Sequence, residues 1–148
     1  MNRPLSVVII ANNASRHIGE VVGAARRVSD DIIVLDSGSE DNTPEIARDM
    51  GARVEFKDWL GYSATKNLGN SLTRHDMILS LDADEVLSDE LIDSILAEEF
   101  DDETIYVLDR ANYYCGQRIR FCHWSPDWIP RIFDRRKARW QGEFVHEK

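Results

Sequence analysis

The chain carries uninterrupted apolar runs that are separated by segments with helical spacing. Three runs dominated by aliphatic residues occupy positions 5–10, 32–35 and 77–81. Such runs are typical of strands that are covered on both faces of a sheet, whereas a strand with one wet face would alternate apolar and polar residues. Val54 and Phe56 predict a further, shorter strand between the second and third runs.

Helical periodicity and capping signals lie between these strands. Ser15 is a candidate N-cap for a helix with a regular apolar stripe. A second helix is expected to be capped by Thr43, which a proline follows, and to stop at Gly51. Residues 62–73 look helical, and Ser88 caps a last helix whose first turn is acidic. The apolar stripes are Ile18, Val21, Val22, Ala25 and Val28 in the first helix and Leu91, Ile92, Ile95 and Leu96 in the last.

Strands that alternate with helices predict an α/β fold with a mostly parallel central sheet and helices on both faces. After residue 103 the pattern changes to short segments rich in aromatic residues, with glycine and proline between them. They predict a small C-terminal β meander attached to the parallel core, at 104–108, 118–121, 128–133 and 138–140. We therefore expect one domain in two parts, an α/β core over 1–109 and a β segment over 110–148.

Composition and charge narrow the possible functions. The 148 residues are 43% hydrophobic and 30% charged, which is ordinary globular usage. The net charge is −9, yet residues 1–109 hold 9 basic and 23 acidic side chains, whereas residues 110–148 hold 9 basic and 4 acidic ones. A basic segment on an acidic body suits an anionic ligand or an anionic membrane surface, and solvated arginine-rich strands are the alternative. The overall acidity argues against an extended nucleic-acid interface.

Cellular location and cysteine usage add little. No apolar run is long enough to span a membrane, and the first residues lack the flanks of a signal peptide, so we expect a cytoplasmic protein. Cys115 and Cys122 fit no usual zinc spacing and are too few for a disulfide scaffold.

Polar residues follow three of the predicted strands at the point where each strand ends. These clusters are Ala11–Asn13, Asp36–Asp41 and Asp82–Glu85. Ligands of open α/β sheets bind beyond the carboxyl ends of the strands, so we expect the three clusters to line one pocket.

Two of the clusters hold carboxylates that suit particular ligands. Asp82 and Asp84 are hard oxygen donors for Mg²⁺ or Mn²⁺ beside a diphosphate, and the alternative is an acidic turn that starts the helix at Ser88. Asp36 could accept hydrogen bonds from a ribose or a base, and the alternative is an Asx-turn that closes the loop. The chain has no glycine-rich phosphate loop, which argues against hydride transfer and P-loop phosphoryl transfer.

The order and spacing of several segments resemble family-two inverting glycosyltransferases of the GT-A fold. Within that family the likeness is to the branch that contains lipopolysaccharide-core glucosyltransferases. The segments are LSVVII-ANN, DDIIVLDSGSEDNTPEIARDMGARV, GYSATKNLG, MILSLDADEVLSDEL and WSPDWIPRIFDRRKARWQGEFVHEK. The resemblance implies a Rossmann-like GT-A fold and a metal-dependent enzyme that moves a sugar from a nucleotide-sugar to an acceptor hydroxyl.

The resemblance also implies roles for individual residues. Asp127 would be the general base that accepts the proton of the acceptor hydroxyl. Asp84 would ligate Mg²⁺ or Mn²⁺, with His146 as a further ligand. The nucleotide-sugar would contact Asn13, Asp36, Ser37, Lys66, Asp82 and Arg131.

The partners implied are a nucleotide-sugar donor, with a UDP-sugar expected first, and a glycan or glycolipid acceptor of the lipopolysaccharide-core kind. The run 135–137 would give peripheral contact with the anionic inner membrane. Family members continue with further helices beyond the point that corresponds to His146, so we expect part of the acceptor site to be missing from this chain.

One departure from the family keeps other functions open. The family usually has Thr-x-Asn-Glu after the first strand, but here Ala11 and Ala14 replace the hydroxyl and the carboxylate. A non-catalytic or degenerate nucleotide-sugar-binding module is therefore the alternative. A nucleotidyltransferase that forms sugar nucleotides would need a glycine-rich basic loop, which residues 11–16 do not supply.

Overall fold

The computed structural model describes residues 4–109, 113–114, 117–118 and 128–141. They form a six-stranded sheet in the order β3-β2-β1-β4-β8-β5 and a separate two-stranded ladder of β6 and β7. The strands are β1 (Leu5–Ala11), β2 (Asp31–Asp36), β3 (Arg53–Phe56), β4 (Met77–Asp82), β5 (Tyr106–Asp109), β6 (Tyr113–Tyr114), β7 (Gln117–Arg118) and β8 (Trp128–Asp134).

The central sheet is parallel on one side and mixed on the other. Strand β1 pairs in parallel with β2 and β4, and β3 pairs in parallel with β2. Strand β8 is antiparallel to both β4 and β5. The expected α/β fold with a mostly parallel sheet is confirmed, and two strands of the expected meander extend that sheet.

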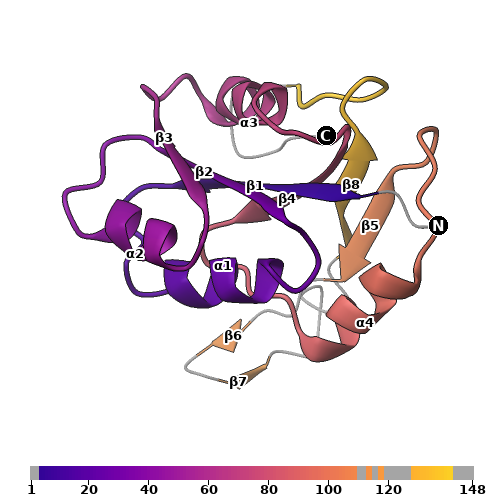
Figure 1. The fold of residues 1–148 in the computed structure, drawn as a ribbon, viewed down its shortest axis with the longest axis horizontal. Helices are drawn as coiled ribbons and strands as arrows, with labels where there is room; N and C mark the ends of the chain where they lie inside the picture. The colour runs from indigo at the N-terminus through magenta and orange to yellow at the C-terminus, as the bar shows by residue number, and fades with distance from the viewer. Residues whose placement is uncertain (1–3, 110–112, 115–116, 119–127, 142–148) are drawn as a thin grey trace.

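Helices cover both faces of the sheet, as expected. They are α1 (Ile18–Ala25), α2 (Thr43–Asp49), α3 (Tyr62–Ser71) and α4 (Asp89–Ala97). Figure 1 shows α3 on one face and α1, α2 and α4 on the other. No helix in the described part of the chain combines the length and the apolar character needed to cross a bilayer.

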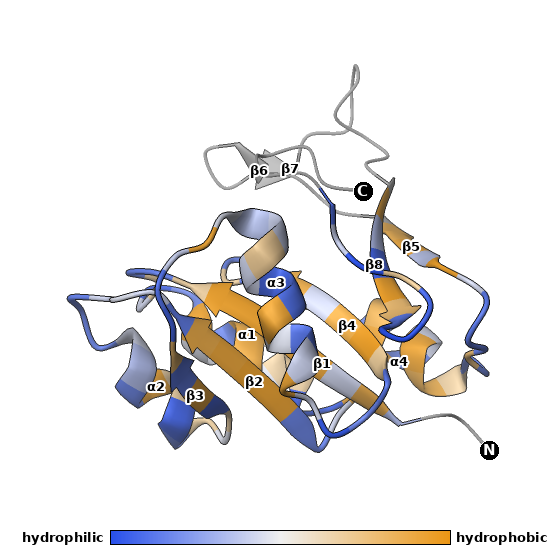
Figure 2. Cartoon of the chain, turned by 90° about the horizontal axis from the view of Figure 1, so that it is seen from above, coloured by the Kyte–Doolittle hydropathy of each residue, from blue (hydrophilic) through white to orange (hydrophobic). Residues whose placement is uncertain are grey.

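The core is divided by the sheet into two apolar layers. Val7 and Ile9 of β1 belong to the larger layer, which also contains the buried residues of α1. Val8, between them, lies in the smaller layer with residues of β2, β4 and β8. Because both faces of the central strands β1, β2 and β4 are buried, these strands are mostly apolar, and Figure 2 shows much of their length in orange.

Helix α3 approaches the sheet closely through a glycine. A Cβ atom on Gly69 would lie 2.6 Å from Val8 Cγ1 and 3.1 Å from Leu35 Cδ1. Any larger residue would push α3 away from β1 and β2. This contact fixes the height of α3 above the sheet, and with it the position of Lys66 in the preceding turn.

The four predicted helices are confirmed, with corrections at their ends. Helix α1 ends at Ala25, before Val28 of the expected stripe, and α3 ends at Ser71 instead of residue 73. The Ser88 side chain accepts a hydrogen bond from the Leu91 N–H, as expected of an N-cap. Ser15 does not cap α1, because the helix starts later and His17 holds the N-cap position without a side-chain cap bond. Thr43 is the first residue of α2 rather than its cap.

Two further segments differ from the sequence-based expectation. Residues 138–140 form no strand, because the main chain of Trp140 bonds to the side chain of Asn67 instead of to a neighbouring strand. Leu96, expected in the apolar stripe of α4, is 51% exposed. The expected strand at 118–121 lies largely outside the described residues.

Candidate functional site

Three polar clusters meet at the carboxyl edge of the parallel strands. Ala11 is level with Asp36 in the β1–β2 ladder, and Ile10 is level with Asp82 in the β1–β4 ladder. The strand order 3-2-1-4 reverses direction between β1 and β4. Such a reversal opens a crevice beyond the carboxyl ends of the strands, where open α/β sheets bind ligands. The structure therefore places the three clusters at the same edge of the sheet, as the topology predicts.

Asp36 ends β2, and only one of its two carboxylate oxygens has a hydrogen-bond partner among the described residues. Its Oδ1 accepts hydrogen bonds from the N–H groups of Gly38 (2.8 Å) and Ser39 (2.7 Å). This closes the loop, and Gly38 takes a φ of 104° there. The residue is fully buried, and Oδ2 has no hydrogen-bond partner within the described residues. A buried acceptor without a donor is costly, which favours a ligand donor at this point.

The loops after β1 and β2 are tied to each other. The Asn12 side chain donates to Ser37 Oγ (3.0 Å), and the Asn13 N–H donates to Ser39 Oγ (2.8 Å). Asn13 has a φ of 51°, and its Oδ1 accepts from the Glu40 N–H at 2.8 Å. Asn13 and Ser37 thus stabilise the loops around Asp36 through hydrogen bonds.

Asp41 secures the end of the β2–α2 loop, just before α2 begins. Asp41 accepts hydrogen bonds from the Thr43 hydroxyl and N–H and from the Ser15 N–H. The bond from the Thr43 side chain, followed by the other loop donors, lowers the pKa of Asp41 to about 2 despite some desolvation. Thr43 Oγ1 in turn accepts from the Ala14 N–H at 2.8 Å. The charge of Asp41 serves the loop rather than a ligand.

Asp82 at the end of β4 lies between two cations. Lys66 Nζ is 3.9 Å from Asp82 Oδ1, and Arg131 Nη2 is 3.5 Å from Asp82 Oδ2. Lys66 is 6% exposed and Arg131 is 7% exposed, so both charges are held away from bulk water. The sequence predicted all three residues as donor contacts, and the structure places them in one group.

Glu85 completes this group and was assigned no role from the sequence. Its Oε1 accepts from the Asp82 N–H at 2.8 Å, and its Oε2 accepts from Arg131 Nη2 at 3.1 Å. The carboxylate therefore fixes the turn after β4 and the guanidinium from β8 at the same time. The spacing of three residues between Asp82 and Glu85 is the sequence signal that could have indicated the backbone contact.

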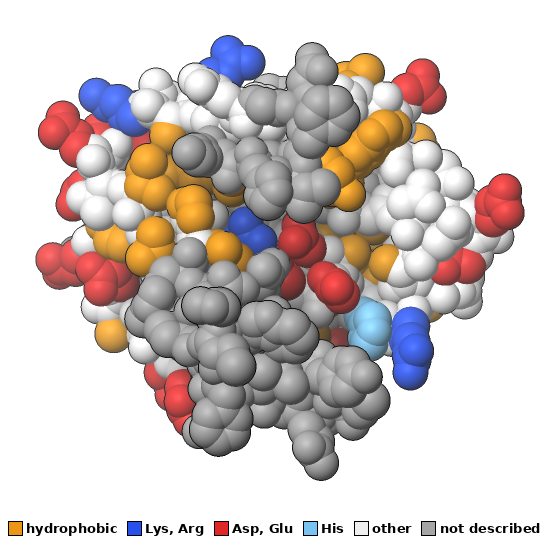
Figure 3. Space-filling model, turned by 180° about the vertical axis from the view of Figure 1, so that it is seen from behind, with side chains coloured by type: hydrophobic (Ala, Val, Ile, Leu, Met, Phe, Trp, Pro, Cys, Tyr) orange, Lys and Arg blue, Asp and Glu red, His pale blue; other side chains and the backbone are white. Residues whose placement is uncertain are grey.

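Lys66 also lies against an aromatic ring. Its Nζ is 4.5 Å from the ring centroid of Trp140, and Trp140 is 4% exposed. No local signal in the sequence links these residues, because they are far apart along the chain. Figure 3, which views the molecule from behind, shows basic and acidic side chains adjacent near the middle of that face.

Asp84, which the sequence predicts as a metal ligand, lies within the described residues. It lies in the exposed turn that follows β4, two residues after Asp82, and makes no hydrogen bond or ion pair with the rest of the described chain. Its hard oxygens fit Mg²⁺ or Mn²⁺. No group of three or more ligand side chains is gathered within the described ranges, so protein ligands there would have to be supplemented by a diphosphate or by other residues.

Two predicted site residues and both cysteines lie outside the described residues. They are Asp127, His146, Cys115 and Cys122. Their roles stay predictions.

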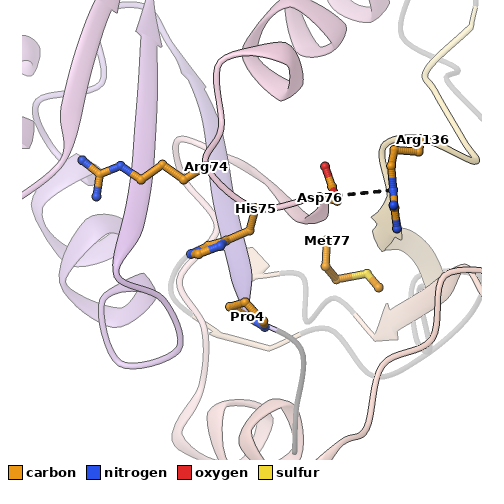
Figure 4. A pocket seen from close by; sticks show the side chains of 6 residues that line it. All are labelled: Pro4, Arg74, His75, Asp76, Met77 and Arg136. Carbon is orange, nitrogen blue, oxygen red and sulfur yellow. Dashed lines mark ion pairs between the residues drawn. The ribbon is translucent and has the colours of Figure 1, made fainter.

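A depression of ≈ 300 Å³ lies at the opposite edge of the sheet, beside the amino ends of β1 and β4 (Figure 4). Its charged groups bond within the protein: Arg136 pairs with Asp134 at 2.7 Å and Asp76 at 3.5 Å, and His75 with Asp30 at 3.0 Å. Neighbouring Arg135 bonds to Asp76 at 3.0 Å. Arg135 and Arg136, predicted to face a membrane, are thus engaged by carboxylates, and the depression is a poor candidate for an anion site.

Relatives with similar sequences are named as glycosyltransferases. An uncharacterized glycosyltransferase of Rickettsia conorii is 40% identical over 135 residues, which cover 90% of this chain and 45% of that protein. Another from Rickettsia felis is 43% identical over 131 residues, covering 87% of this chain and 44% of the relative. The chain thus spans less than half the length of these relatives.

Solved structures of glycosyltransferases have a similar fold. Glucosyl-3-phosphoglycerate synthase from Mycobacterium tuberculosis, in complex with Mg²⁺ and uridine diphosphate, superposes with a TM-score of 0.51 at 29% identity. The match covers 57% of this chain and 34% of that one, and the fold is that of GT-A glycosyltransferases. Residues 6–147 match the sequence pattern of glycosyl transferase family 2, and the chain therefore belongs to that family.

Proposed function

We propose that the chain binds a nucleoside-diphosphate sugar, with a UDP-sugar as donor, at the carboxyl edge of β1, β2 and β4. One observation carries the proposal: the buried Oδ2 of Asp36 has no partner among the described residues. Asp36 ends β2 on one side of β1, and Asp82 ends β4 on the other side of β1. A ribose hydroxyl or a base N–H would supply the missing donor. The mycobacterial neighbour crystallised with uridine diphosphate and Mg²⁺ supports this choice of donor.

The two buried cations would receive the diphosphate. Lys66 and Arg131 already lie within 3.9 Å and 3.5 Å of Asp82, so their charges are in place before the donor arrives. Preorganised charges cost little reorganisation when negative charge develops on a leaving group. Asn13 and Ser37 would contribute through the loops that they hold around Asp36.

Asp84 and His146 would hold a divalent metal ion. The exposed carboxylate of Asp84 fits a hard cation, whereas Asp82 already faces two protein cations. With Mg²⁺ or Mn²⁺ held there, these residues would help to offset the negative charge of the diphosphate leaving group.

Transfer would proceed with inversion at the anomeric carbon. The acceptor oxygen forms a bond to that carbon while the bond to the diphosphate oxygen breaks, and the electron pair leaves with the diphosphate. Asp127 would accept the hydroxyl proton from the face opposite the leaving group. We assign donor binding to residues 1–109 and the acceptor side to residues 110–148, with Arg131 and His146 reaching the donor from this second segment. The acceptor we propose is a glycan or glycolipid of the lipopolysaccharide-core kind, reached from the cytoplasmic side of the inner membrane.

Calorimetric titration with UDP in the presence and absence of Mg²⁺ tests the proposal. We expect Mg²⁺-dependent binding by the wild-type chain and its loss in Asp84→Asn. Asp89→Asn is the matched control, because Asp89 is an exposed carboxylate nearby whose partner is Arg27 on the surface. Binding that is absent in the wild type, or unchanged in Asp84→Asn, would contradict the proposed donor and metal site respectively.

A non-catalytic binding module is the second candidate function. It is favoured by Ala11 and Ala14, which replace the hydroxyl and carboxylate usual in the family. Incubation of the chain with a UDP-sugar and a mixed glycan acceptor separates the two. Sugar transfer that Asp127→Asn abolishes, with donor binding intact, supports the enzyme; metal-dependent donor binding without transfer or donor hydrolysis supports the module.

A further inference from the structure

Two consecutive residues of α3 contact the same tryptophan. The Asn67 side chain donates to the Trp140 carbonyl (2.9 Å) and accepts from the Trp140 N–H (2.9 Å). Lys66 places its ammonium 4.5 Å from the centroid of the Trp140 ring. One residue therefore holds the main chain of Trp140 and the other lies on its ring.

The ring itself has little freedom to move. Trp140 is 4% exposed and packs with Phe133 in a T-shaped pair, with 5.7 Å between ring centroids. It belongs to the smaller apolar layer that Val8, Ile33 and Ile78 also form. Its indole N–H has no hydrogen-bond partner among the described residues, so apolar packing and the main-chain bonds to Asn67 set the ring position.

The position of the Trp140 ring matters because Lys66 contacts both this ring and Asp82. The same Nζ that contacts the indole is 3.9 Å from Asp82 Oδ1. A lysine has four rotatable bonds and would otherwise sample many positions for its charge. The face of an indole attracts a cation by roughly 0.5–2 kcal/mol, and the attraction is largest where water is excluded.

We infer that Trp140 is a positioning residue for the donor: its indole face holds the Lys66 ammonium beside Asp82, ready to receive a diphosphate. The inference rests on the proposed function and extends it to a residue that is not among the proposed donor contacts. Asn67 acts one step further out, because it fixes the main chain that carries the indole. Lys66 and Asn67, which are adjacent on α3, then act together: Lys66 supplies the cation, and Asn67 holds the main chain of the tryptophan that the cation contacts.

A double-mutant cycle on UDP binding tests this role. The variants are Trp140→Leu, Lys66→Met and the two combined, each titrated calorimetrically with UDP and Mg²⁺. We expect Trp140→Leu to weaken binding about tenfold when Lys66 is present and less than about twofold in the Lys66→Met background. Trp140→Phe keeps an aromatic face and should restore binding to within about threefold of the wild type.

Trp140→Leu also disturbs the smaller apolar layer, so a control variant must show what a disturbance of this layer does by itself. Ile78→Val trims the same layer without removing the indole, so it should lower the melting temperature and leave the UDP affinity unchanged. As an independent signature, the Lys66 side-chain protons should be shifted upfield by the ring in the wild type and return to ordinary values in Trp140→Leu.

The outcomes separate this inference from the function on which it rests. If the wild-type chain binds no UDP, the proposed function fails and the positioning role fails with it. If the wild type binds UDP and Trp140→Leu weakens binding equally with and without Lys66, only the positioning role is overturned, because Trp140 then acts through the fold alone.

Discussion

Replacing Asp36 by asparagine separates the structural role of its Oδ1 from the ligand-binding role that we propose for its Oδ2. Oδ1 accepts the N–H groups of Gly38 and Ser39, at 2.8 Å and 2.7 Å, and an asparagine oxygen can accept both bonds. Oδ2 is buried without a described partner, and in Asp36→Asn an amide NH₂ takes its place. The variant should keep the loop and lose the acceptor that we assign to the nucleoside.

The size of the effect follows from the chemistry of that acceptor. A hydrogen bond to a charged group contributes roughly 1.5–3 kcal/mol, which corresponds to about 10- to 150-fold in the dissociation constant. The free energy of unfolding should change by less than ~1 kcal/mol, because both loop bonds survive. Asp36→Ala removes the loop bonds as well and should lower stability and affinity together.

Calorimetry with UDP and Mg²⁺, paired with urea unfolding, measures both quantities. Asp41→Asn is the control in the same loop, because the Asp41 carboxylate bonds to Ser15 and Thr43 instead of facing a ligand. It should destabilise the loop without a specific loss of affinity. If Asp36→Asn bound UDP within twofold of the wild type while folding normally, the assignment of Oδ2 to the nucleoside would be wrong.

Three further predictions concern the scaffold around the site. Gly69→Ala places a methyl group 2.6 Å from Val8 Cγ1 and should destabilise the chain by ~1–3 kcal/mol in urea unfolding; an unchanged midpoint would show that α3 can shift without cost. Burial tends to raise the pKa of Asp31, but hydrogen bonds from the backbone and side chains of its neighbours outweigh it and lower that pKa. The stability that the Asp31 charge contributes is therefore complete above the unfolded pKa and is lost as pH falls through the lower folded pKa. The difference in free energy of unfolding between the wild type and Asp31→Asn should shrink between roughly pH 5 and pH 2. A difference that stays constant over this range would contradict the prediction. Glu85→Gln removes one of the two carboxylates that pair with Arg131 and should cost ~1.5–3 kcal/mol of stability and weaken binding of UDP with Mg²⁺; a double-mutant cycle with Arg131→Met that gives additive losses would refute the coupling.

The sequence predicted the architecture because local and global signals agree in the first part of the chain. Aliphatic runs marked the strands, and a serine at position 88 with an acidic first turn marked α4, which begins at Asp89. The N-terminus of α1 was placed too early, because Ser15 is used differently: its N–H donates to the distant Asp41. Contacts between loops that are far apart in sequence leave no periodic trace.

The candidate site was predictable where it depends on strand ends. Asp36 and Asp82 follow buried strands, and parallel strands end at a shared edge, so their proximity followed from the topology. The support of Lys66 by Trp140 was not predictable, because it depends on the way in which the chain after β8 passes α3. The predicted strand at 138–140 was wrong for the same reason, since Asn67 takes the main-chain bonds of Trp140.

Nuclear magnetic resonance titration of the ¹⁵N-labelled chain with UDP and Mg²⁺ tests the central claim most directly, because it locates the ligand. We expect the largest amide shifts in the loops that follow β1, β2 and β4, at Ser37, Gly38 and Ala83, and smaller shifts near Lys66. In Asp36→Asn these shifts should need about 10- to 150-fold more UDP. Shifts confined to the opposite edge, around Arg74 and Arg136, or no shifts at all, would contradict a donor site at the carboxyl edge of the sheet.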